Sequence, residues 1–369
     1  MKTNFKRAFK VLSLLLAVVV LTAALQEFVF RRFDTMQLIV DSFYKEEENT
    51  LDIALIGASE FTSGYAPGLA YEEYGFRSYN FAPDSNPISL FLYELKEIQK
   101  TQNPQIVFVE INGALYDEGG AHNEPQLRRV LDCTPISKNK IDTIKHIFGK
   151  MDYSYLFPIM KYHYSTGEYK IQQEEIESYN QVRKRGYSLL KGMITNTGNT
   201  TEGEAYNMLD FPEKAPLDPL CEKYLYEFLD YCKAQNLNVV FFRFPQRVTE
   251  ENLTRALRSK TAKDIITSYG FEYFDFLTNP SAIGIDLNTH FYNNEHLNVV
   301  GQAIMTRKLC EIAKERGVVA TKVSTEQKKK WDETVKYYHL FYDYAVKANS
   351  EGKAVWMAED AKTLSLIES

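Results

Sequence analysis

Short runs of apolar residues that alternate with stretches of helical periodicity are the feature of this sequence that most restricts its fold. Five such runs occupy residues 51–56, 75–82, 105–111, 237–244 and 272–277. Helical patterns fill the intervals and the region after the last run, at residues 88–99, 220–235, 254–269 and 299–316. Apolar strands that alternate with helices form parallel sheets covered on both faces. We therefore predict a three-layer α/β/α domain whose functional side chains lie at the C-terminal edge of the sheet.

The alternation breaks in the middle of the chain. Residues 113–218 are polar and rich in tyrosine, and we assign residues 126–218 to an insertion that forms a cap over the C-terminal edge of the sheet. The sheet domain is then divided into residues 50–125 and 219–318. Residues 325–369 are predicted to form a helical tail. Its aromatic residues are expected to pack on the body; they are Tyr337, Tyr338, Phe341, Tyr342 and Tyr344.

The N-terminus has the composition of a membrane-spanning segment. Four basic residues precede an apolar run at residues 11–25, and Arg31 and Arg32 follow it. About twenty apolar residues span the hydrocarbon of a bilayer. The basic residues predict that the N-terminus is cytoplasmic and that the chain from about residue 33 lies outside. We predict a single-pass anchor at residues 1–32; a signal peptide cleaved near residues 22–24 is the alternative.

Composition excludes several classes of protein. The 369 residues carry a formal charge of −6, 44% are hydrophobic, and only four are cysteines, which argues against collagen-like, disulfide-framework and disordered chains. No surplus of basic residues is available to bind nucleic acid. The cysteines lack metal-ligand spacing, and His290 and His296 lack a third ligand, so we predict no metal and no cofactor. The cysteines are expected to be buried free thiols, although disulfide pairing stays open; they are Cys133, Cys221, Cys232 and Cys310.

Two short segments contain residues suited to nucleophilic catalysis. Ser59 follows Gly57 and Ala58 at the end of the first predicted strand, where a serine is exposed at the sheet edge or serves as a helix N-cap. His296 lies in the sequence EHLNVVG at the start of the last helix of the sheet domain, where it can act as a general base or be an ordinary surface histidine. We expect the two side chains to meet at the edge of the sheet.

The Gly-x-Ser and His-Leu-Asn-x-x-Gly segments, in this order and strand context, resemble the SGNH/GDSL hydrolase superfamily. With the N-terminal anchor, the chain is most similar to the membrane-anchored branch that includes the D-alanyl transfer proteins of lipoteichoic acid assembly (DltD) and related envelope-polymer acyltransferases. The resemblance covers about residues 50–125 and 235–315. It implies that Ser59 is the nucleophile and His296 the catalytic base.

The resemblance also implies an oxyanion hole. The main-chain amides around Ala58 and Ser59 would contribute to it. Ser85 is at the position of an oxyanion-hole glycine, and Asn112 corresponds loosely to an asparagine that donates to the oxyanion. Three further residues are predicted to line the site; they are Asn80, Asp84 and Arg247.

Asn293 is the main departure from the superfamily pattern, which has aspartate three residues before the histidine. A buried carboxylate orients the imidazole and stabilises its protonated form, whereas an amide oxygen accepts the imidazole N–H without adding charge. Two interpretations stay open: an active Ser–His pair oriented by Asn293, and a catalytically degenerate protein that only binds.

The resemblance implies acyl transfer or ester hydrolysis on an envelope glycopolymer, with a membrane O-acyltransferase as a partner that could supply the acyl group. The competing hypothesis is a binding or assembly factor with the same fold. A solute-binding protein is disfavoured, because it would have two equal α/β lobes.

Overall fold

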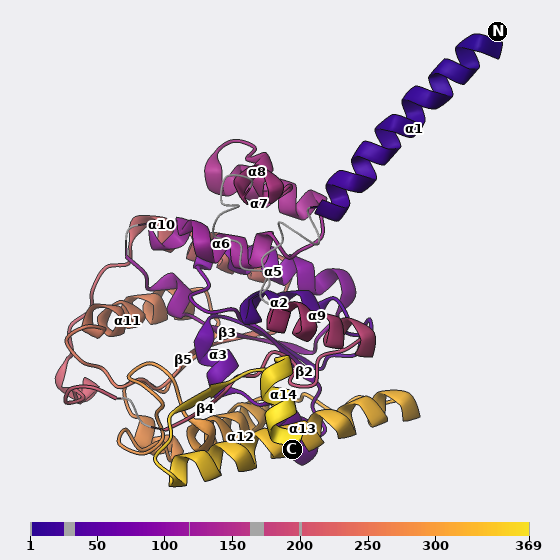
Figure 1. Cartoon of the computed structure of the whole chain (residues 1–369). Coiled ribbons are helices and arrows are strands. Elements are labelled where there is room, and N and C mark those ends of the chain that lie inside the picture. Colours follow the sequence, from indigo (N-terminus) through magenta and orange to yellow (C-terminus); the bar gives the residue numbers. More distant parts are fainter. Residues whose placement is uncertain (1, 26–33, 118, 163–172, 199–200, 369) are drawn as a thin grey trace.

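A five-stranded parallel sheet forms the centre of the protein (Figure 1). The computed structural model describes residues 2–25, 34–117, 119–162, 173–198 and 201–368. The sheet has the strand order β2-β1-β3-β5-β6 and consists of β1 (Ile53–Ile56), β2 (Ser78–Phe81), β3 (Ile106–Glu110), β5 (Val239–Arg243) and β6 (Glu272–Asp275). All five predicted strands are therefore confirmed, each slightly shorter than its apolar run.

Alternate residues of the strands face two separate helical layers. Ala54, Ile56, Val107 and Val109 pack in one apolar cluster with the first layer, which consists of α2 (Thr35–Phe43), α5 (Ile88–Thr101), α10 (Pro219–Ala234) and α11 (Leu253–Ser268). Ile53, Leu55, Ile106 and Phe108 pack with the second layer, which consists of α3 (Ser59–Gly64), α4 (Pro67–Tyr74) and α12 (Val299–Glu315). The predicted three-layer α/β/α architecture is confirmed.

The order of the strands fixes where a ligand site can form. The chain places β2 on one side of β1 and β3 on the other, so that the direction of winding reverses at β1. In open parallel sheets, such a reversal leaves a crevice outside the C-terminal ends of the two central strands. Here those ends are Ile56 of β1 and Glu110 of β3.

The inserted region is not the single cap that the sequence predicted. Its helices are α6 (Glu124–Leu131), α7 (Lys138–Phe148), α8 (Ile159–Tyr162) and α9 (Gln173–Arg185). Leu127, Val130 and Ile144 join the apolar cluster of α5 and α10, so α6 and α7 cover a helical layer rather than the strand edge (Figure 1). The reason is that both helices are amphipathic and bury their apolar stripes on the nearest apolar surface. Single-turn helices occur at η2 (Asn112–Ala114), η3 (Gly120–His122), η4 (Tyr153–Tyr155), η5 (Met208–Asp210) and η6 (Pro280–Ile283).

The C-terminal tail packs on the body, as predicted, and it does so against the second helical layer. Its long helix α13 (Thr325–Ser350) buries Tyr337, Tyr338 and Phe341 against Ala66 and Leu69. The tail also contains a strand that the sequence did not predict, β7 (Val355–Met357), which pairs antiparallel with β4 (Thr195–Thr197) before the last helix α14 (Ala361–Glu368). The tail and the inserted region are therefore joined by a second, small sheet.

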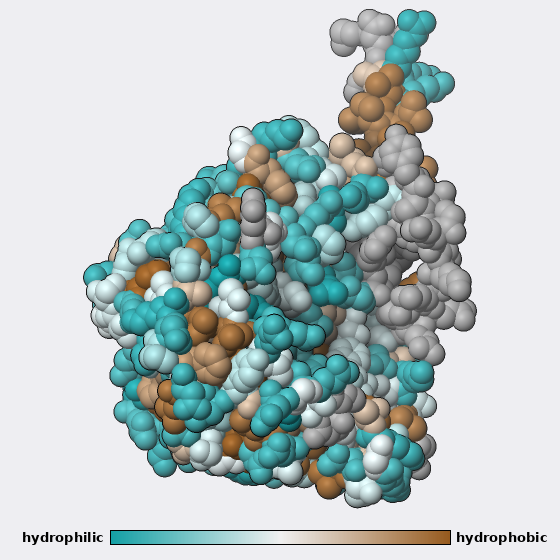
Figure 2. Space-filling model, turned by 90° about the vertical axis from the view of Figure 1, so that its left-hand side faces the viewer, coloured by the Kyte–Doolittle hydropathy of each residue, from teal (hydrophilic) through white to brown (hydrophobic). Residues whose placement is uncertain are grey.

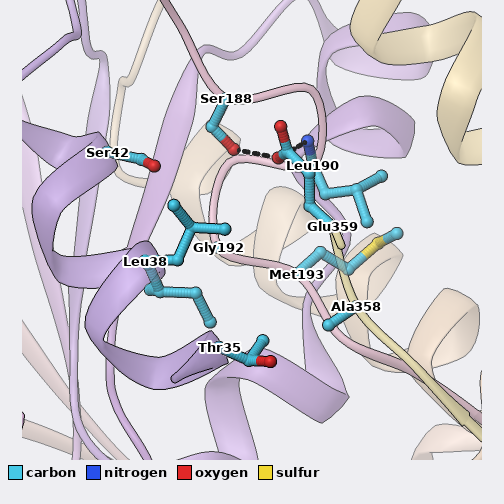
Figure 3. Close-up of a pocket in the computed structure, with 10 residues that line it drawn as sticks. Thr35, Leu38, Ser42, Ser188, Leu190, Gly192, Met193, Ala358 and Glu359 are labelled. Carbon is cyan, nitrogen blue, oxygen red and sulfur yellow. Dashed lines mark hydrogen bonds between the residues drawn. The ribbon is translucent and has the colours of Figure 1, made fainter. Parts of the chain in front are cut away.

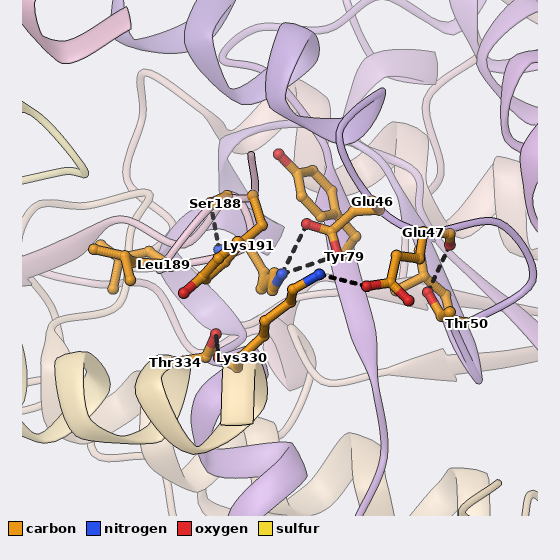
Figure 4. Close-up of polar contacts among 12 residues, drawn as sticks. Glu46, Glu47, Thr50, Tyr79, Ser188, Leu189, Lys191, Lys330 and Thr334 are labelled. Atoms are coloured by element: carbon orange, nitrogen blue, oxygen red, sulfur yellow. Dashed lines mark hydrogen bonds and ion pairs between the residues drawn. The ribbon is translucent and has the colours of Figure 1, made fainter. Parts of the chain in front are cut away.

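A buried ion pair fastens the inserted region to the start of the sheet domain (Figure 4). Lys191 Nζ lies 2.8 and 2.9 Å from the two carboxylate oxygens of Glu46, and the two side chains are 2% and 5% exposed. The ammonium group also lies over the ring of Trp331, 5.0 Å from its centroid. We refer to Lys191, Glu46 and the neighbouring ion pair of Arg185 with Glu359 as the Lys191 brace.

A small cavity of about 10 Å³ adjoins the Lys191 brace, between α2 and the segment that contains Ser188 (Figure 3). The Glu359 carboxylate at its side accepts hydrogen bonds from Ser188 Oγ and from the backbone N–H groups of Leu189 and Leu190, at 2.5, 2.9 and 3.0 Å. A space of this size holds about one water molecule. It is therefore a packing defect beside a satisfied carboxylate rather than a binding site.

The helix α1 (Lys2–Leu25) projects away from this body (Figure 1). Its apolar segment Lys6–Leu25 is long enough to cross a membrane and is not buried by the rest of the described chain. Figure 2 shows its brown, apolar residues clear of the body at the upper right. A signal sequence has the same properties, so both predictions for this segment remain. The four cysteines are buried free thiols, as expected.

Candidate active site

Ser59 lies at the crevice between β1 and β3. Gly57 precedes it, and a Cβ atom there would lie 2.9 Å from Glu110 Cβ and 3.2 Å from the Glu110 carbonyl oxygen. Only glycine therefore lets the chain leave β1 this close to the end of β3. Ala58 is the N-cap of α3, and Ser59 is its first helical residue. The side chain of Ser59 bonds to His296, so the N-cap interpretation is wrong.

His296 reaches the crevice from the loop between β6 and α12. The segment His-Leu-Asn-x-x-Gly holds this loop in place: Leu297 is buried, and Asn298 caps α12 by accepting hydrogen bonds from the N–H groups of Val300 and Gly301 at 3.1 and 3.2 Å. Asn298 Nδ2 also donates to the Thr289 carbonyl at 2.8 Å. Each residue of the motif other than the histidine thus has a structural task, which is to present His296 at the sheet edge.

Ser59, His296 and Asn293 form a continuous hydrogen-bonded chain. His296 Nε2 lies 2.7 Å from Ser59 Oγ, and His296 Nδ1 lies 2.9 Å from Asn293 Oδ1. All three side chains are partly exposed. The expected meeting of the serine and the histidine, which are far apart in sequence, is present in the structure.

The backbone around Asn293 determines which nitrogen of His296 carries the proton. Asn293 Oδ1 accepts hydrogen bonds from the N–H groups of Glu295 and His296, both at 2.9 Å. Backbone N–H groups only donate, so the atom that faces them and the imidazole must be the amide oxygen. That oxygen cannot donate, so Nδ1 carries the proton and Nε2 is left to accept from Ser59 Oγ. Asn293 therefore selects the tautomer that a general base requires.

Burial and the nearby charges act in opposite directions on the pKa of His296. Burial of the imidazole lowers the pKa of His296, and the negative charges of Asp84 and Glu295 act in the opposite direction. Glu295 is itself paired with Arg255, whose positive charge also lowers the pKa of His296. Asp84, predicted to line the site, is thus close enough to the imidazole for the two charges to interact.

Two of the predicted oxyanion donors are suited to that task. Ser85 is exposed and has φ +54°, the left-handed conformation that favours glycine. Asn112 accepts a hydrogen bond through Oδ1 from Arg243 Nη1 at 3.2 Å, so its Nδ2 is not used in this contact. Within the described ranges, Asn112 Nδ2 and the backbone N–H groups of Ser59 and Ser85 have no hydrogen-bond partner. Ala58 is fully buried beside them.

Asn80 and Arg247 do not line the site. Asn80 is fully buried in β2 and donates through Nδ2 to the Tyr65 carbonyl at 3.1 Å. Arg247 is 6% exposed, and its guanidinium donates to the carbonyl groups of Leu287 and Gly203 at 3.1 and 2.8 Å. Both predictions were wrong for the same reason, because a polar residue near a strand end is as readily used to satisfy buried carbonyl groups as to contact a ligand.

A buried group of charged residues beneath the crevice was missed. Glu60, Glu110 and Arg243 are each at most 2% exposed and lie at the ends of three different elements, α3, β3 and β5. The sequence carries the signal, since a glutamate and an arginine interrupt the apolar runs QIVFVEI and LNVVFFRF. No cluster of three or more metal-ligating side chains is found in the part of the chain that the structure describes.

Comparisons with known proteins give remote structural similarity only. No family model matches the sequence, and no curated protein matches it. Among solved structures, a protein assigned to the G-D-S-L lipolytic family from Desulfitobacterium hafniense is 9% identical with a TM-score of 0.34, and 72% of this chain covers 99% of that one. A protein assigned as an acylhydrolase from Bacteroides fragilis is 10% identical with a TM-score of 0.39, over 77% of this chain and 99% of that one. An acetylxylan esterase from Geobacillus stearothermophilus is 12% identical with a TM-score of 0.32, and the match covers 75% of this chain and 99% of the esterase.

Proposed function

We propose that this protein is a serine esterase or acyltransferase of the SGNH type, with Ser59 as the nucleophile and His296 as the general base. The observation that carries the proposal is the hydrogen bond of 2.7 Å between Ser59 Oγ and His296 Nε2, with Nδ1 fixed by Asn293. A nucleophile, a base and a group that orients the base are the parts that covalent acyl transfer requires.

The reaction follows from the tautomer of His296. As Ser59 Oγ attacks the acyl carbonyl carbon, its proton passes to His296 Nε2. When the tetrahedral intermediate collapses, the imidazolium returns that proton to the leaving alkoxide, and an ester with Ser59 remains. Water or an acceptor hydroxyl then loses its proton to Nε2 and attacks this ester. When the second tetrahedral intermediate collapses, the imidazolium returns the proton to Ser59 Oγ, which frees the serine and the neutral histidine.

The negative charge of the tetrahedral intermediate needs hydrogen-bond donors that are already in place. The unpartnered N–H groups of Ser59 and Ser85, with Asn112 Nδ2, would supply them. Removing one such donor lowers turnover by roughly 10²- to 10³-fold in other enzymes. Asp84 and Glu295 would supply through space part of the negative charge that Asn293 lacks, because both favour the protonated imidazole.

The substrate proposal rests on the resemblance together with the anchor. If α1 holds the protein in a membrane with the sheet domain outside, a cell-envelope glycopolymer that carries acyl esters, as the resemblance implies, is within reach, and a membrane O-acyltransferase is the acyl donor that the resemblance suggests. Protease treatment of intact cells tests this: the domain is digested if it is outside and protected if it is cytoplasmic. Recovery of the domain in the soluble fraction would indicate cleavage near residues 22–24.

Turnover of a chromogenic acetyl ester by the full chain in detergent tests the activity. We expect hydrolysis by the wild type, loss in Ser59→Ala, and retention in Ser63→Ala, a matched control because Ser63 lies in the same helix and bonds to Asn196 instead. A folded wild type that does not turn over any acyl ester, but binds an envelope glycopolymer saturably, would favour the binding or assembly factor. That second candidate rests on the amide at position 293.

A further inference from the structure

Arg243 connects the predicted oxyanion donor to two buried carboxyl groups. Its Nη1 lies 3.2 Å from Glu110 Oε1 and 3.2 Å from Asn112 Oδ1, and its Nη2 lies 2.6 Å from Gln246 Oε1. Gln246 Nε2 continues the chain to Glu60 Oε1 at 2.9 Å. We refer to Glu60, Glu110 and Arg243 as the Arg243 cluster.

Asn112 is held at both its backbone and its side chain by this cluster. Its backbone N–H donates to Glu110 Oε2 at 2.9 Å, while its side-chain oxygen accepts from Arg243. Because an arginine only donates, the contact fixes the orientation of the amide, with the oxygen inward and Nδ2 away from the cluster. A lysine cannot reproduce this, since it lacks the planar fork that serves Glu110, Asn112 and Gln246 together.

The Arg243 cluster has more acid than base. Arg243 and Glu110 are fully buried and Glu60 is 2% exposed, so two carboxyl groups face one guanidinium. Burial raises the pKa of Glu60 to about 7 and that of Glu110 to about 8, and the charge of Arg243 only partly opposes this. The Glu295–Arg255 ion pair and two tyrosines, Tyr116 and Tyr273, also act on the cluster. Burial raises the pKa of each tyrosine well above its ordinary value, so both tyrosines stay neutral.

We propose that the Arg243 cluster is a positioning device for Asn112, in which Arg243 and Glu110 fix the amide for oxyanion binding and the two carboxyl groups retain one proton between them. The proposal rests on the proposed function for its catalytic part. The shared proton lets two acids lie next to one guanidinium, because a second buried negative charge without a partner would be strongly unfavourable.

A double-mutant cycle tests whether Arg243 acts through Asn112. We expect Asn112→Ala to lower kcat by about 10²- to 10³-fold with little change in KM. Arg243→Lys should lower kcat by a similar factor, and the double variant should be no slower than the slower single variant. If the two losses multiply in the double variant, Arg243 does not act through Asn112 and the proposal fails.

The shared proton has a readout that does not need activity. Since the pKa values of both carboxyl groups are higher in the folded state than in the unfolded state, folding retains a proton, and stability falls as the pH rises from about 5 to 8. We expect Glu60→Gln to reduce this fall in the denaturation midpoint of the full chain in detergent, because Glu110 is then paired one to one with Arg243 and no longer retains the shared proton. The matched control is Glu315→Gln, a carboxyl group that is 67% exposed, and it should leave the fall unchanged. If the denaturation midpoint of Glu60→Gln falls with pH as steeply as that of the wild type, the proposal of a shared proton is wrong.

The two measurements separate this proposal from the proposed function. If Ser59 is inactive in the wild type, the proposed function fails, and the pH dependence of stability still decides whether a proton is shared. If the wild type is active but the kcat losses of Asn112→Ala and Arg243→Lys multiply in the double variant, the proposed function stands and the positioning role of Arg243 fails.

Discussion

Two of the groups of opposite charges that are buried in the described part of the chain, the Lys191 brace and the Arg243 cluster, differ in how the charges are balanced. The Lys191 brace pairs each acid with a base: Lys191 with Glu46, and Arg185 with Glu359. The Glu359 carboxylate is further satisfied by Ser188 and the backbone N–H of Leu190 (Figure 3), and by the backbone N–H of Leu189. The Arg243 cluster has one base for two acids, and Glu60 Oε2 and Arg243 Nε have no hydrogen-bond partner among the described residues.

This difference separates a structural from a functional use of buried charge. A balanced and fully bonded cluster fastens segments, here the inserted region to the start of the sheet domain. Burying a cluster with unequal numbers of acids and bases is unfavourable in free energy. Such clusters are therefore expected next to functional sites, where they hold a neighbouring side chain in a fixed position. Variants in the two clusters should therefore change different properties, stability for the Lys191 brace and turnover for the residues around the crevice.

The largest expected effect is on turnover. His296→Ala removes the general base, and we expect kcat to fall by roughly 10⁴-fold or more, while the denaturation midpoint stays close to that of the wild type because the residue as a whole is partly exposed. Steady-state kinetics and chemical denaturation of the same preparation measure both. A parallel loss of folding would mean that the histidine is structural.

The Lys191 brace should show the reverse pattern. Lys191→Met leaves the Glu46 carboxylate buried without its partner, and we expect a loss of on the order of 3 kcal/mol in the free energy of unfolding with kcat unchanged. Because burial raises the pKa of Glu46, the loss should be smaller at pH 5, where Glu46 takes up a proton more readily. Chemical denaturation at pH 5 and pH 8 measures the difference.

Lys330→Met is the matched control for that experiment. Lys330 pairs with Glu47 near the brace, but its side chain is 28% exposed, so we expect a loss below about 1 kcal/mol (Figure 4). Equal losses in the two lysine variants would contradict the account of the Lys191 brace.

Charge at position 293 should set the acidic limb of the pH–rate profile. The base is active only when neutral, so activity is lost as the pH falls through the pKa of His296. Asn293→Asp adds a negative charge beside the imidazole, which raises the pKa of His296 and moves the limb to higher pH. Asp84→Asn removes a negative charge near the imidazole and should move the acidic limb of the pH–rate profile to lower pH. Shifts in the same direction for both variants would exclude the electrostatic explanation.

The smallest expected effect is at Ser85. Its φ of +54° is unfavourable for any residue with a Cβ atom, so Ser85→Gly should raise the free energy of unfolding by about 0.5 to 1 kcal/mol and leave kcat within about twofold. A marked loss of turnover would mean that the serine side chain, rather than the backbone N–H, takes part in the site. Thermal denaturation and steady-state kinetics check both.

Much of the fold could be predicted because its signals are local. The strands are apolar runs bounded by turns, and the tail carries an aromatic stripe, so β1 (Ile53–Ile56) and α13 (Thr325–Ser350) follow from sequence alone. Residues Thr195–Thr197 and Val355–Met357 pair to form a sheet of only two short strands, and neither segment has a strand pattern of its own. The inserted region was predicted to cap the edge of the sheet, whereas α6 and α7 pack on a helical layer, because amphipathicity shows that a face is buried but not against what.

The site was predictable in part for the same reason. Ser59 and His296 stand in short segments with a recognisable order, and their meeting follows from the position of strand ends in a parallel sheet. The role of Asn293 was not predictable, since the orientation of its amide depends on two backbone N–H groups in a loop. Asn80 and Arg247 were misassigned because their partners are backbone carbonyl groups far away in sequence.

The central claim is that the His296 imidazole makes the Ser59 hydroxyl nucleophilic, and a fluorophosphonate probe followed by peptide mass spectrometry tests it most directly. We predict one covalent adduct, located on Ser59, that forms near pH 7, is absent in Ser59→Ala and His296→Ala, and persists in Ser63→Ala. A folded wild type that acquires no adduct, or acquires one at another residue, would contradict the account.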